Sequence, residues 1–430
     1  MPEFRRFITA ILITLAVILP LTACNDTPPP AMARQIMTGP AAMDPDLSYI
    51  CQDGSLLYTY YDSTPEDFSR LCRDYENQGY TLYNASVMGD NLVSTYVAGS
   101  TMVHIYRHGA TGELNLVQSG DAGATLPPAI PEHGEEVTPC TVTQMMDEDS
   151  PIGMGYVVQL TDGSYILYDG SYESQVDRIE QFLLENHRGE GRPVIRAWVL
   201  THSHQDHVEA FMTFAERARA EERFIVEHII VSPLNPDEYT LNEKDDVNYL
   251  SGDFYQDAEA FTGAKVIFAH TGMTFAFGNL RMEVLYAPES HFKQTNQILY
   301  FNNTSLVTRL YDNNYSALFL GDVGHTGTDL MVEYYGDYLQ SDMCQVSHHG
   351  LKDVPLSFYE VVQAPLLFFP CNQDLYNRFG DNGDVRLGLQ EKPYTKEILI
   401  AGLAQYTRPW GTTFAADAPL SMPDYVPPNS

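Results

Sequence analysis

The stretch THSHQDH, residues 201–207, decides the fold of this 430-residue chain. It follows an apolar run at 194–200 that we predict to be a buried strand. It leads directly into an amphipathic segment at 208–220 that we predict to be a helix. Further strands and helices alternate on either side, which indicates a layered α/β domain.

Four side chains of this stretch are metal-ligand types. His202 and His204 stand two residues apart at the end of the strand, so their imidazoles point to the same side. Asp206 and His207 lie at the start of the next helix, and the turn between strand and helix brings all four together. Imidazole nitrogens and carboxylate oxygens suit zinc, manganese or iron, so the stretch predicts a metal site.

An HxHxDH motif after a buried strand resembles the signature of the metallo-β-lactamase fold superfamily, over residues 138–418. The resemblance implies a four-layer αββα domain that binds two divalent metal ions, zinc or else manganese, and hydrolyses its substrate with a metal-activated water. It assigns His202 and His204 to the first metal and Asp206 and His207 to the second.

Two downstream stretches also match this superfamily. ALFLGD, residues 317–322, is an apolar strand that ends in Gly-Asp, where the superfamily has a metal-bridging Asp. The resemblance therefore gives Asp322 to both metals. QVSHHG, residues 345–350, stands where the superfamily has its last His ligand. Either His348 or His349 fills that role, and we prefer His348.

The third superfamily motif departs from its usual form. Most members have a His where NNTSLV, residues 302–307, has Asn302 or Asn303. Either the first metal has one ligand fewer, or an Asn oxygen replaces the His, or His291 supplies the ligand from further upstream. NNTSLV, GDV, SHHG and the segment at 401–412 together resemble the metallo-β-lactamase domain of competence-type DNA-uptake proteins.

Catalytic roles follow from the same resemblance. We interpret Asp206 and Asp322 as catalytic, and His325 as a general acid, a substrate contact, an extra metal ligand or a plain loop residue. Asp169 resembles a strand-end Asp that supports a His ligand. The expected substrate is a phosphodiester or other ester, including small molecules. The alternatives are a lactonase-like or phosphorylcholine-esterase-like enzyme, and a surface binding lipoprotein with a vestigial metal site.

The N-terminus looks like a bacterial lipoprotein signal. Arg5 and Arg6 precede an apolar run at 7–19, and LTAC, residues 21–24, resembles a lipobox. Lipid on Cys24 would hold the protein at the outer side of the bacterial cell membrane. We divide the chain into a signal peptide (1–23), a tether (24–45), a small α+β domain (46–120), a linker (121–137), the hydrolase domain (138–418) and a tail (419–430).

Charge and cysteine content narrow the possible partners. The formal net charge is −33, which disfavours nucleic acid as a partner because its binding relies on Lys and Arg. Metal ions or a local basic groove would still permit it. The chain has six Cys, and lipid on Cys24 would leave five. A disulfide framework is therefore not expected, although one pair such as Cys51–Cys72 is possible.

Replacing Cys24 tests the predicted anchor. We expect Cys24→Ala to remain unprocessed or to leave the membrane fraction, because alanine cannot carry the lipid. Intact mass and membrane fractionation measure both effects. An unchanged mass and an unchanged membrane fraction would show that Cys24 is not the anchor.

Overall fold

The computed structural model describes residues 45–51, 53–132, 134–145, 150–232, 254–289, 301–351, 353–378 and 385–423. The predicted signal peptide, Cys24 and nearly all of the tether lie outside these ranges, and so does His291. None of the described helices combines the length and apolar character needed to cross a bilayer.

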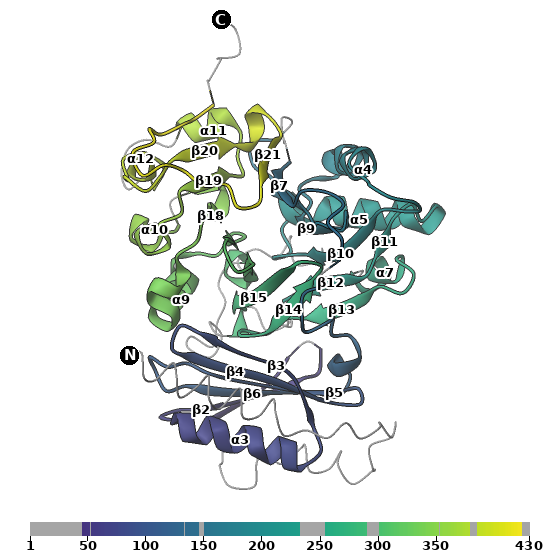
Figure 1. The fold of residues 1–430 in the computed structure, drawn as a ribbon, viewed down its shortest axis with the longest axis vertical. Coiled ribbons are helices and arrows are strands. Elements are labelled where there is room, and N and C mark those ends of the chain that lie inside the picture. Colours follow the sequence, from purple (N-terminus) through teal and green to yellow (C-terminus); the bar gives the residue numbers. More distant parts are fainter. Residues whose placement is uncertain are drawn as a thin grey trace, which may run out of the picture. The chain divides into compact units, whose positions relative to one another are not determined.

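The first sheet is antiparallel and has the strand order β1-β2-β6-β5-β4-β3 (Figure 1). Helix α3 (Pro65–Asn77) packs against one face of this sheet. The stretch TPED, residues 64–67, predicts a helix start with a cap and Pro at the first helical position, and the helix begins there. Thr64 and Asp67 each accept a hydrogen bond from the other's backbone N–H. The strands are β1 (Leu47–Ile50), β2 (Leu56–Tyr60), β3 (Thr81–Met88), β4 (Asn91–Ala98), β5 (Thr101–Arg107) and β6 (Leu114–Ser119).

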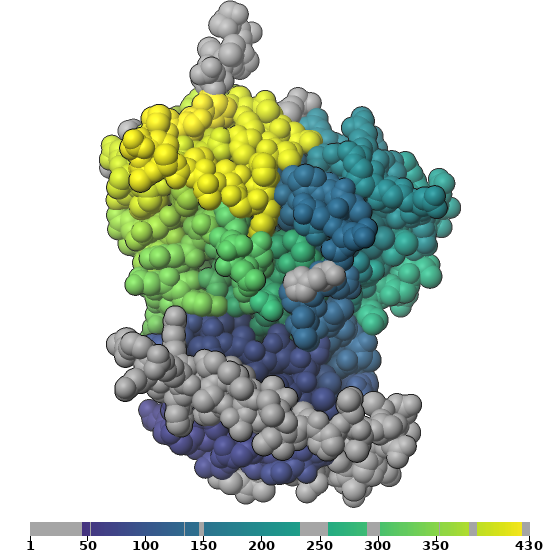
Figure 2. Space-filling view, viewed as in Figure 1, coloured from purple at the N-terminus to yellow at the C-terminus, as the bar shows by residue number. Residues whose placement is uncertain are grey.

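The second sheet has the order β13-β12-β10-β9-β8-β7-β21, with β11 beside β10. Strands β9, β10, β12 and β13 are parallel, and β21 returns from the C-terminal end of the chain to pair antiparallel with β7. Figure 2 shows this yellow segment beside the blue one that carries β7. The strands are β7 (Thr141–Gln144), β8 (Gly155–Gln159), β9 (Tyr165–Asp169), β10 (Val194–Val199), β11 (Ile225–Val226), β12 (His228–Val231), β13 (Lys265–Phe268) and β21 (Tyr406–Pro409).

The third sheet runs β14-β15-β16-β17-β18-β19-β20. Its first four strands are antiparallel, and β17 to β20 are parallel. The strands are β14 (Thr274–Phe277), β15 (Leu280–Tyr286), β16 (Val307–Tyr311), β17 (Ser316–Phe319), β18 (Met343–Gln345), β19 (Leu366–Phe369) and β20 (Glu397–Ile400).

Apolar side chains join these two sheets and their helices into four layers. One cluster fills the space between the sheets, with Tyr168 of β9 stacked on Phe319 of β17 at 3.9 Å between ring centroids. A second cluster packs helices on the outer face of the second sheet, where Phe211 meets Trp198 edge-on. The helices are α4 (Val176–Glu185), α5 (Gln205–Ala220) and α7 (Phe254–Glu259) on this side, and α9 (His325–Tyr335), α10 (Leu356–Val362), α11 (Gln373–Arg378) and α12 (Val385–Gln390) on the other. The predicted αββα layering, preceded by a small α+β part, is confirmed.

The first sheet shares an apolar cluster with the αββα layers. Residues 39–430 form one compact unit. Leu57 and Tyr106 of the first sheet belong to the same buried cluster as Leu285 and Met331. The side chain of Asn91 donates to the carbonyl oxygen of Tyr334 at 2.8 Å. The domain limits predicted from the sequence stay predictions, but this shared cluster argues that the two parts stabilise each other.

Production of residues 138–430 alone tests this dependence. The sequence predicts from the linker that this fragment folds and binds metal independently. The shared cluster leads us to expect the opposite, because removing the first sheet exposes an apolar surface that favours aggregation. Size-exclusion chromatography and thermal unfolding of fragments 138–430 and 45–430 measure the difference. A monomeric shorter fragment with an unchanged unfolding midpoint would restore the original expectation.

Candidate metal centre

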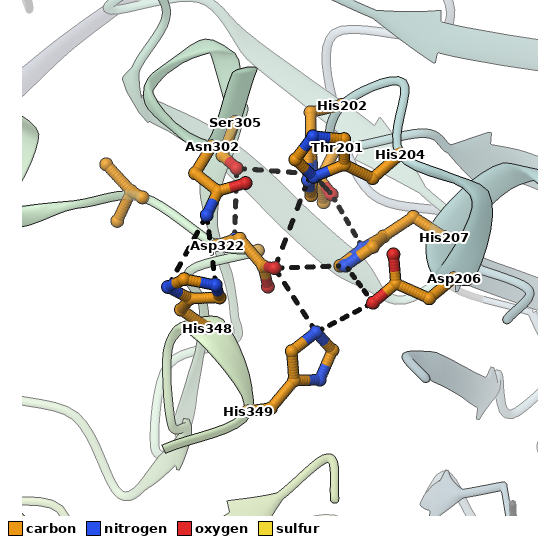
Figure 3. Close-up of polar contacts among 12 residues, drawn as sticks. Thr201, His202, His204, Asp206, His207, Asn302, Ser305, Asp322, His348 and His349 are labelled. Atoms are coloured by element: carbon orange, nitrogen blue, oxygen red, sulfur yellow. Dashed lines mark hydrogen bonds and ion pairs between the residues drawn. The ribbon is translucent and has the colours of Figure 1, made fainter. Parts of the chain in front are cut away.

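The candidate metal centre lies where parallel strands of two sheets end. Asp169 is the last residue of β9, and residues 201–207 follow its parallel neighbour β10. Asp322 and residues 347–349 follow the parallel strands β17 and β18 of the other sheet. Parallel strands end at the same edge of a sheet, so side chains far apart in the sequence converge there (Figure 3).

Four ligand-type side chains form the first group. Their ligand atoms, from Asp206, His207, Asp322 and His349, all lie within 4.8 Å of one another, and all four residues are buried. His349 Nε2 is 2.9 Å from Asp206 Oδ2 and 3.2 Å from Asp322 Oδ2. His207 Nε2 is 3.7 Å and 3.3 Å from the same two oxygens.

These separations fit a bound cation. In a tetrahedral site with metal–ligand bonds of about 2.0–2.2 Å, neighbouring ligand atoms lie about 3.3–3.6 Å apart. Asp322 Oδ1 is buried and has no hydrogen-bond partner among the described residues, and the buried His207 Nε2 and His349 Nε2 face the carboxylates of Asp206 and Asp322. Buried polar atoms rarely stay unpaired, so the group has the donor chemistry and spacing of a divalent metal site.

A second group shares Asp322 with the first. His202, His204 and Asp322 bring ligand atoms within 4.8 Å of one another. His202 Nε2 is 3.0 Å from His204 Nδ1 and 4.0 Å from Asp322 Oδ2. Two groups with one common carboxylate are an arrangement that can hold two cations side by side.

Hydrogen bonds behind the ligands fix which imidazole nitrogen faces the centre. His349 Nδ1 donates to the carbonyl oxygen of Pro370 at 2.6 Å, so Nε2 is the atom left for a metal. His207 Nδ1 donates to Asp169 Oδ2 at 2.7 Å. Asp169 also accepts from the backbone N–H and the hydroxyl of Thr201, both at 2.7 Å. Asp169 therefore holds both a ligand and the loop that carries the HxHxDH motif.

Electrostatics at the centre favour a cation. Burial raises the pKa of Asp322, but His349 and His207 outweigh burial and hold it well below its ordinary value. Burial opposes imidazolium formation, yet Asp322 and Asp206 raise the pKa of His349 to about 10. The negative charge of the buried carboxylates therefore has to be offset by positive charge nearby. A divalent ion would supply that charge by displacing protons from the imidazoles.

The loop that carries Asp322 is held closely by its neighbours. Gly321 has a φ of +55°, and a Cβ there would lie 3.0 Å from the hydroxyl oxygens of Ser305 and Thr201. Ser305 Oγ accepts from the backbone N–H of Asp322 at 3.0 Å. The Gln345 side chain donates to the Gly321 carbonyl oxygen at 3.0 Å. Residues 320–322 are therefore positioned by both sheets.

The two neighbouring histidines have different surroundings. The sequence favoured His348 as the last ligand, but the structure places His349 in the four-ligand group. His348 Nδ1 lies 2.5 Å from Asp353 Oδ2, and His348 Nε2 accepts from Asn302 Nδ2 at 3.0 Å. Both histidines have positive φ, 48° and 55°, and this turn sends their side chains to different partners.

The third-motif asparagines also separate. Asn302, in the 3₁₀ helix η5 (Phe301–Thr304), has a buried Oδ1 with no hydrogen-bond partner among the described residues. Asn303 Oδ1 instead accepts from the backbone N–H of Gly324 at 3.2 Å. Asn302 is therefore the better placed of the two to offer an oxygen, and Asn303 supports the loop after Asp322.

His325 is not brought into the ligand groups. It is the first residue of α9, it is exposed, and its backbone oxygen accepts from Thr328 Oγ1 at 2.9 Å. Its catalytic role stays a prediction. Ser305 and the Pro370 carbonyl were not identified from the sequence. Ser305 lies within the NNTSLV motif, which could have pointed to it. The Pro370 contact is made by a backbone oxygen, which no sequence motif identifies.

Sequence comparison agrees with this geometry. The profile of the Metallo-beta-lactamase superfamily matches residues 152–287. The chain contains a metallo-β-lactamase superfamily domain. The match includes the HxHxDH motif but ends before Asp322 and His349, which the fold alone brings to the motif. No curated protein is significantly similar to the chain.

Several solved structures are similar to parts of the chain at low identity. The metallo-β-lactamase fold protein YhfI from Bacillus subtilis is 14% identical, with 63% of this chain and 100% of YhfI covered and a TM-score of 0.40. Zn²⁺-bound PqqB from Methylobacterium extorquens is 14% identical, with 48% and 71% covered and a TM-score of 0.30. The diiron β-hydroxylase CmlA from Streptomyces venezuelae is 12% identical, with 63% of this chain and 46% of CmlA covered and a TM-score of 0.32.

Alanine at each of the two neighbouring histidines tests the ligand assignment. Both positions have positive φ, so alanine adds similar backbone strain to each and the two variants form a matched pair. We expect His349→Ala to lose about one bound divalent ion per chain, because it removes a ligand atom of the four-ligand group. We expect His348→Ala to keep its metal. Elemental analysis with circular dichroism distinguishes the variants, and metal loss only in His348→Ala would reverse the assignment.

Proposed function

We propose that the protein is a metal-dependent hydrolase that acts on a phosphodiester or other ester at the bacterial cell surface. The observation that carries the proposal is the pair of ligand groups that share Asp322. The metallo-β-lactamase superfamily consists mainly of hydrolases, which supports this class of reaction. Two bound divalent ions, zinc or else manganese, would supply Lewis acidity and a water of lowered pKa.

The protein residues supply position and charge. Asp206 and Asp322 provide the negative charge that keeps two cations close together. Asp169 and the Pro370 carbonyl orient His207 and His349 from behind, so the ligand atoms face the centre without rearrangement. A preorganised site of this kind loses little free energy to reorganisation when a substrate's charge changes during the reaction.

A covalent thiol mechanism has no support at this centre. Cys344 and Cys371 are the described cysteines nearest in sequence to the ligands, and both are buried. Burial raises the pKa of Cys371 to about 12 and raises that of Cys344 above its ordinary value. Both therefore remain thiols near neutral pH, and thiols are poor nucleophiles. We therefore assign the attack to a water molecule rather than to a thiol.

The substrate class rests on two further considerations. The likeness to competence-type proteins supports a phosphodiester, whereas the net charge of −33 disfavours long nucleic acids at moderate salt. A lipid on Cys24 would place the enzyme beside envelope components that carry phosphodiesters. We therefore favour a small or envelope-bound phosphodiester over DNA.

A substrate screen with Asp322→Asn tests the proposal. Asparagine keeps the size of the side chain but removes the charge shared by both ligand groups. We expect the full chain, loaded with Zn²⁺ or Mn²⁺, to hydrolyse bis(4-nitrophenyl) phosphate. We expect Asp322→Asn to lose about 100-fold or more, since changes even behind metal ligands cost about 10–100-fold. The screen also includes a phosphomonoester, a phosphorylcholine ester, a lactone and a β-lactam.

The control is Asp329→Asn, the same substitution at an exposed position on α9. It should keep wild-type activity and metal content. Hydrolysis of only the lactone or the phosphorylcholine ester would replace the phosphodiester assignment. Full activity in metal-depleted Asp322→Asn would contradict the metal-dependent mechanism. A wild-type chain that binds metal but hydrolyses none of these compounds would favour a binding lipoprotein.

A further inference from the structure

A second cluster of ligand-type side chains lies apart from the metal centre and shares no residue with it. Ligand atoms of Cys51, Asp53 and His270 lie within 4.8 Å of one another. Cys51 and Asp53 belong to the turn between β1 and β2 of the first sheet, and His270 follows β13 of the second. The cluster therefore connects the first sheet to the αββα layers.

The cluster is shielded from solvent. His270 is 0% exposed and Cys51 is 3% exposed. The Asp53 side chain is 9% exposed. Buried Asp side chains are normally paired or bound to a metal, so the cluster requires a compensating positive charge.

The imidazole of His270 turns Nε2 toward the β1–β2 turn. Nε2 lies 3.9 Å from Asp53 Oδ2 and 3.4 Å from Ser55 Oγ. Nδ1 is buried, lies 3.6 Å from Glu289 Oε1 and makes no hydrogen bond with the described residues. Nε2 is therefore the nitrogen that faces Asp53.

The turn that carries Cys51 and Asp53 is firmly held. Cys51 N–H donates to the carbonyl oxygen of Ser55 at 2.9 Å, and Gly54 N–H donates to that of Cys51 at 2.9 Å. Asp53 Oδ1 accepts from both the backbone N–H and the hydroxyl of Ser55, at 3.0 and 2.6 Å. These bonds occupy Oδ1 and leave Oδ2 toward His270.

The loop that carries His270 is held as firmly from the other side. His104 Nε2 on β5 donates to the carbonyl oxygen of Thr271 at 3.0 Å. Gly272 has a φ of +90°, and a Cβ there would lie 3.2 Å from Tyr106 Cβ. Such close approach requires glycine, and it fixes the distance between the loop and the first sheet.

We propose that Cys51, Asp53 and His270 bind a divalent transition-metal ion, with Zn²⁺ preferred, that links the β1–β2 turn to the loop at 269–273. Sulfur, nitrogen and oxygen ligands together suit Zn²⁺. One thiolate and one carboxylate balance its two positive charges, and binding releases the thiol proton of Cys51. The site is structural: it joins two sheets that otherwise meet through apolar packing and hydrogen bonds.

The competing arrangement is a metal-free ion pair. Although burial opposes it, the nearby carboxylates of Asp53 and Glu289 raise the pKa of His270 to about 9. An imidazolium on His270 would then balance Asp53 and leave Cys51 as a thiol. The ion pair contains no sulfur–metal bond, so detection of such a bond distinguishes the metal site from the ion pair.

Cobalt substitution of the full chain tests the site. Thiolate ligation of Co²⁺ produces a sulfur-to-metal charge-transfer band in the near ultraviolet. Within the part of the chain that the structure describes, the groups at the metal centre offer nitrogen and oxygen ligands, and Cys51 is the cysteine that joins a ligand group. Loss of the band in Cys51→Ser therefore assigns it to Cys51. We expect the band in wild type and in Asp322→Asn, and its loss in Cys51→Ser.

The matched control is Cys72→Ser, at a second buried cysteine of the same N-terminal part. Neither Cys51 nor Cys72 forms a disulfide with a cysteine that the structure describes. Cys72→Ser should keep the band. X-ray absorption of zinc-loaded Asp322→Asn gives an answer even if Cys51→Ser does not fold, because thiolate ligation gives a Zn–S distance of about 2.3 Å. Absence of both the band and the Zn–S distance, or a band that survives in Cys51→Ser, would overturn the proposal.

Discussion

The burial of Asp206 and Asp322 between two sheets is the constraint on which the rest of the site depends. Two carboxylates within reach of the same imidazole nitrogen repel each other strongly where water is excluded. The fold meets this cost by bringing histidines from both sheets to the same point. The Asp169 and Pro370 contacts position two of those histidines, and Ser305 and Gln345 hold the loop that carries Asp322. A divalent cation can offset the charge of both carboxylates while the histidines stay neutral.

The layered architecture explains how the constraint is met. The ends of β9 and β10 deliver one half of the ligand set, and the ends of β17 and β18 deliver the other. The apolar cluster between the sheets fixes their separation, as in the stacked pair Tyr168 and Phe319. A close-packed core of this kind does not deform gradually. The packing of the apolar cluster between the two sheets therefore helps to fix the distances between the ligand atoms.

Local patterns predicted the parts of the structure that depend on neighbouring residues. The cap at Thr64, the strand before the HxHxDH motif and the strand that leads to Asp322 were all visible in the sequence, although β17 ends at Phe319. Helix α5 begins at Gln205, three residues earlier than predicted, because no signal separated the turn from the first helical turn. The choice of His349 over His348 depends on a backbone φ and on a carbonyl at the end of β19. The approach of Cys51 to His270 joins residues separated by more than half the length of the chain. No local sequence pattern encodes this approach or the difference between His348 and His349.

The pairing of β21 with β7 has a consequence for the order in which the chain can mature. Most paired strands of the first sheet are neighbours in the sequence, and its last strand ends at Ser119, so the sheet can form while synthesis continues. Strand β7 lacks its outer partner until residues 406–409 are available. Until then an edge of the second sheet presents unpaired backbone groups, which are a template for association with other chains. The C-terminal segment is therefore the part that completes the second sheet.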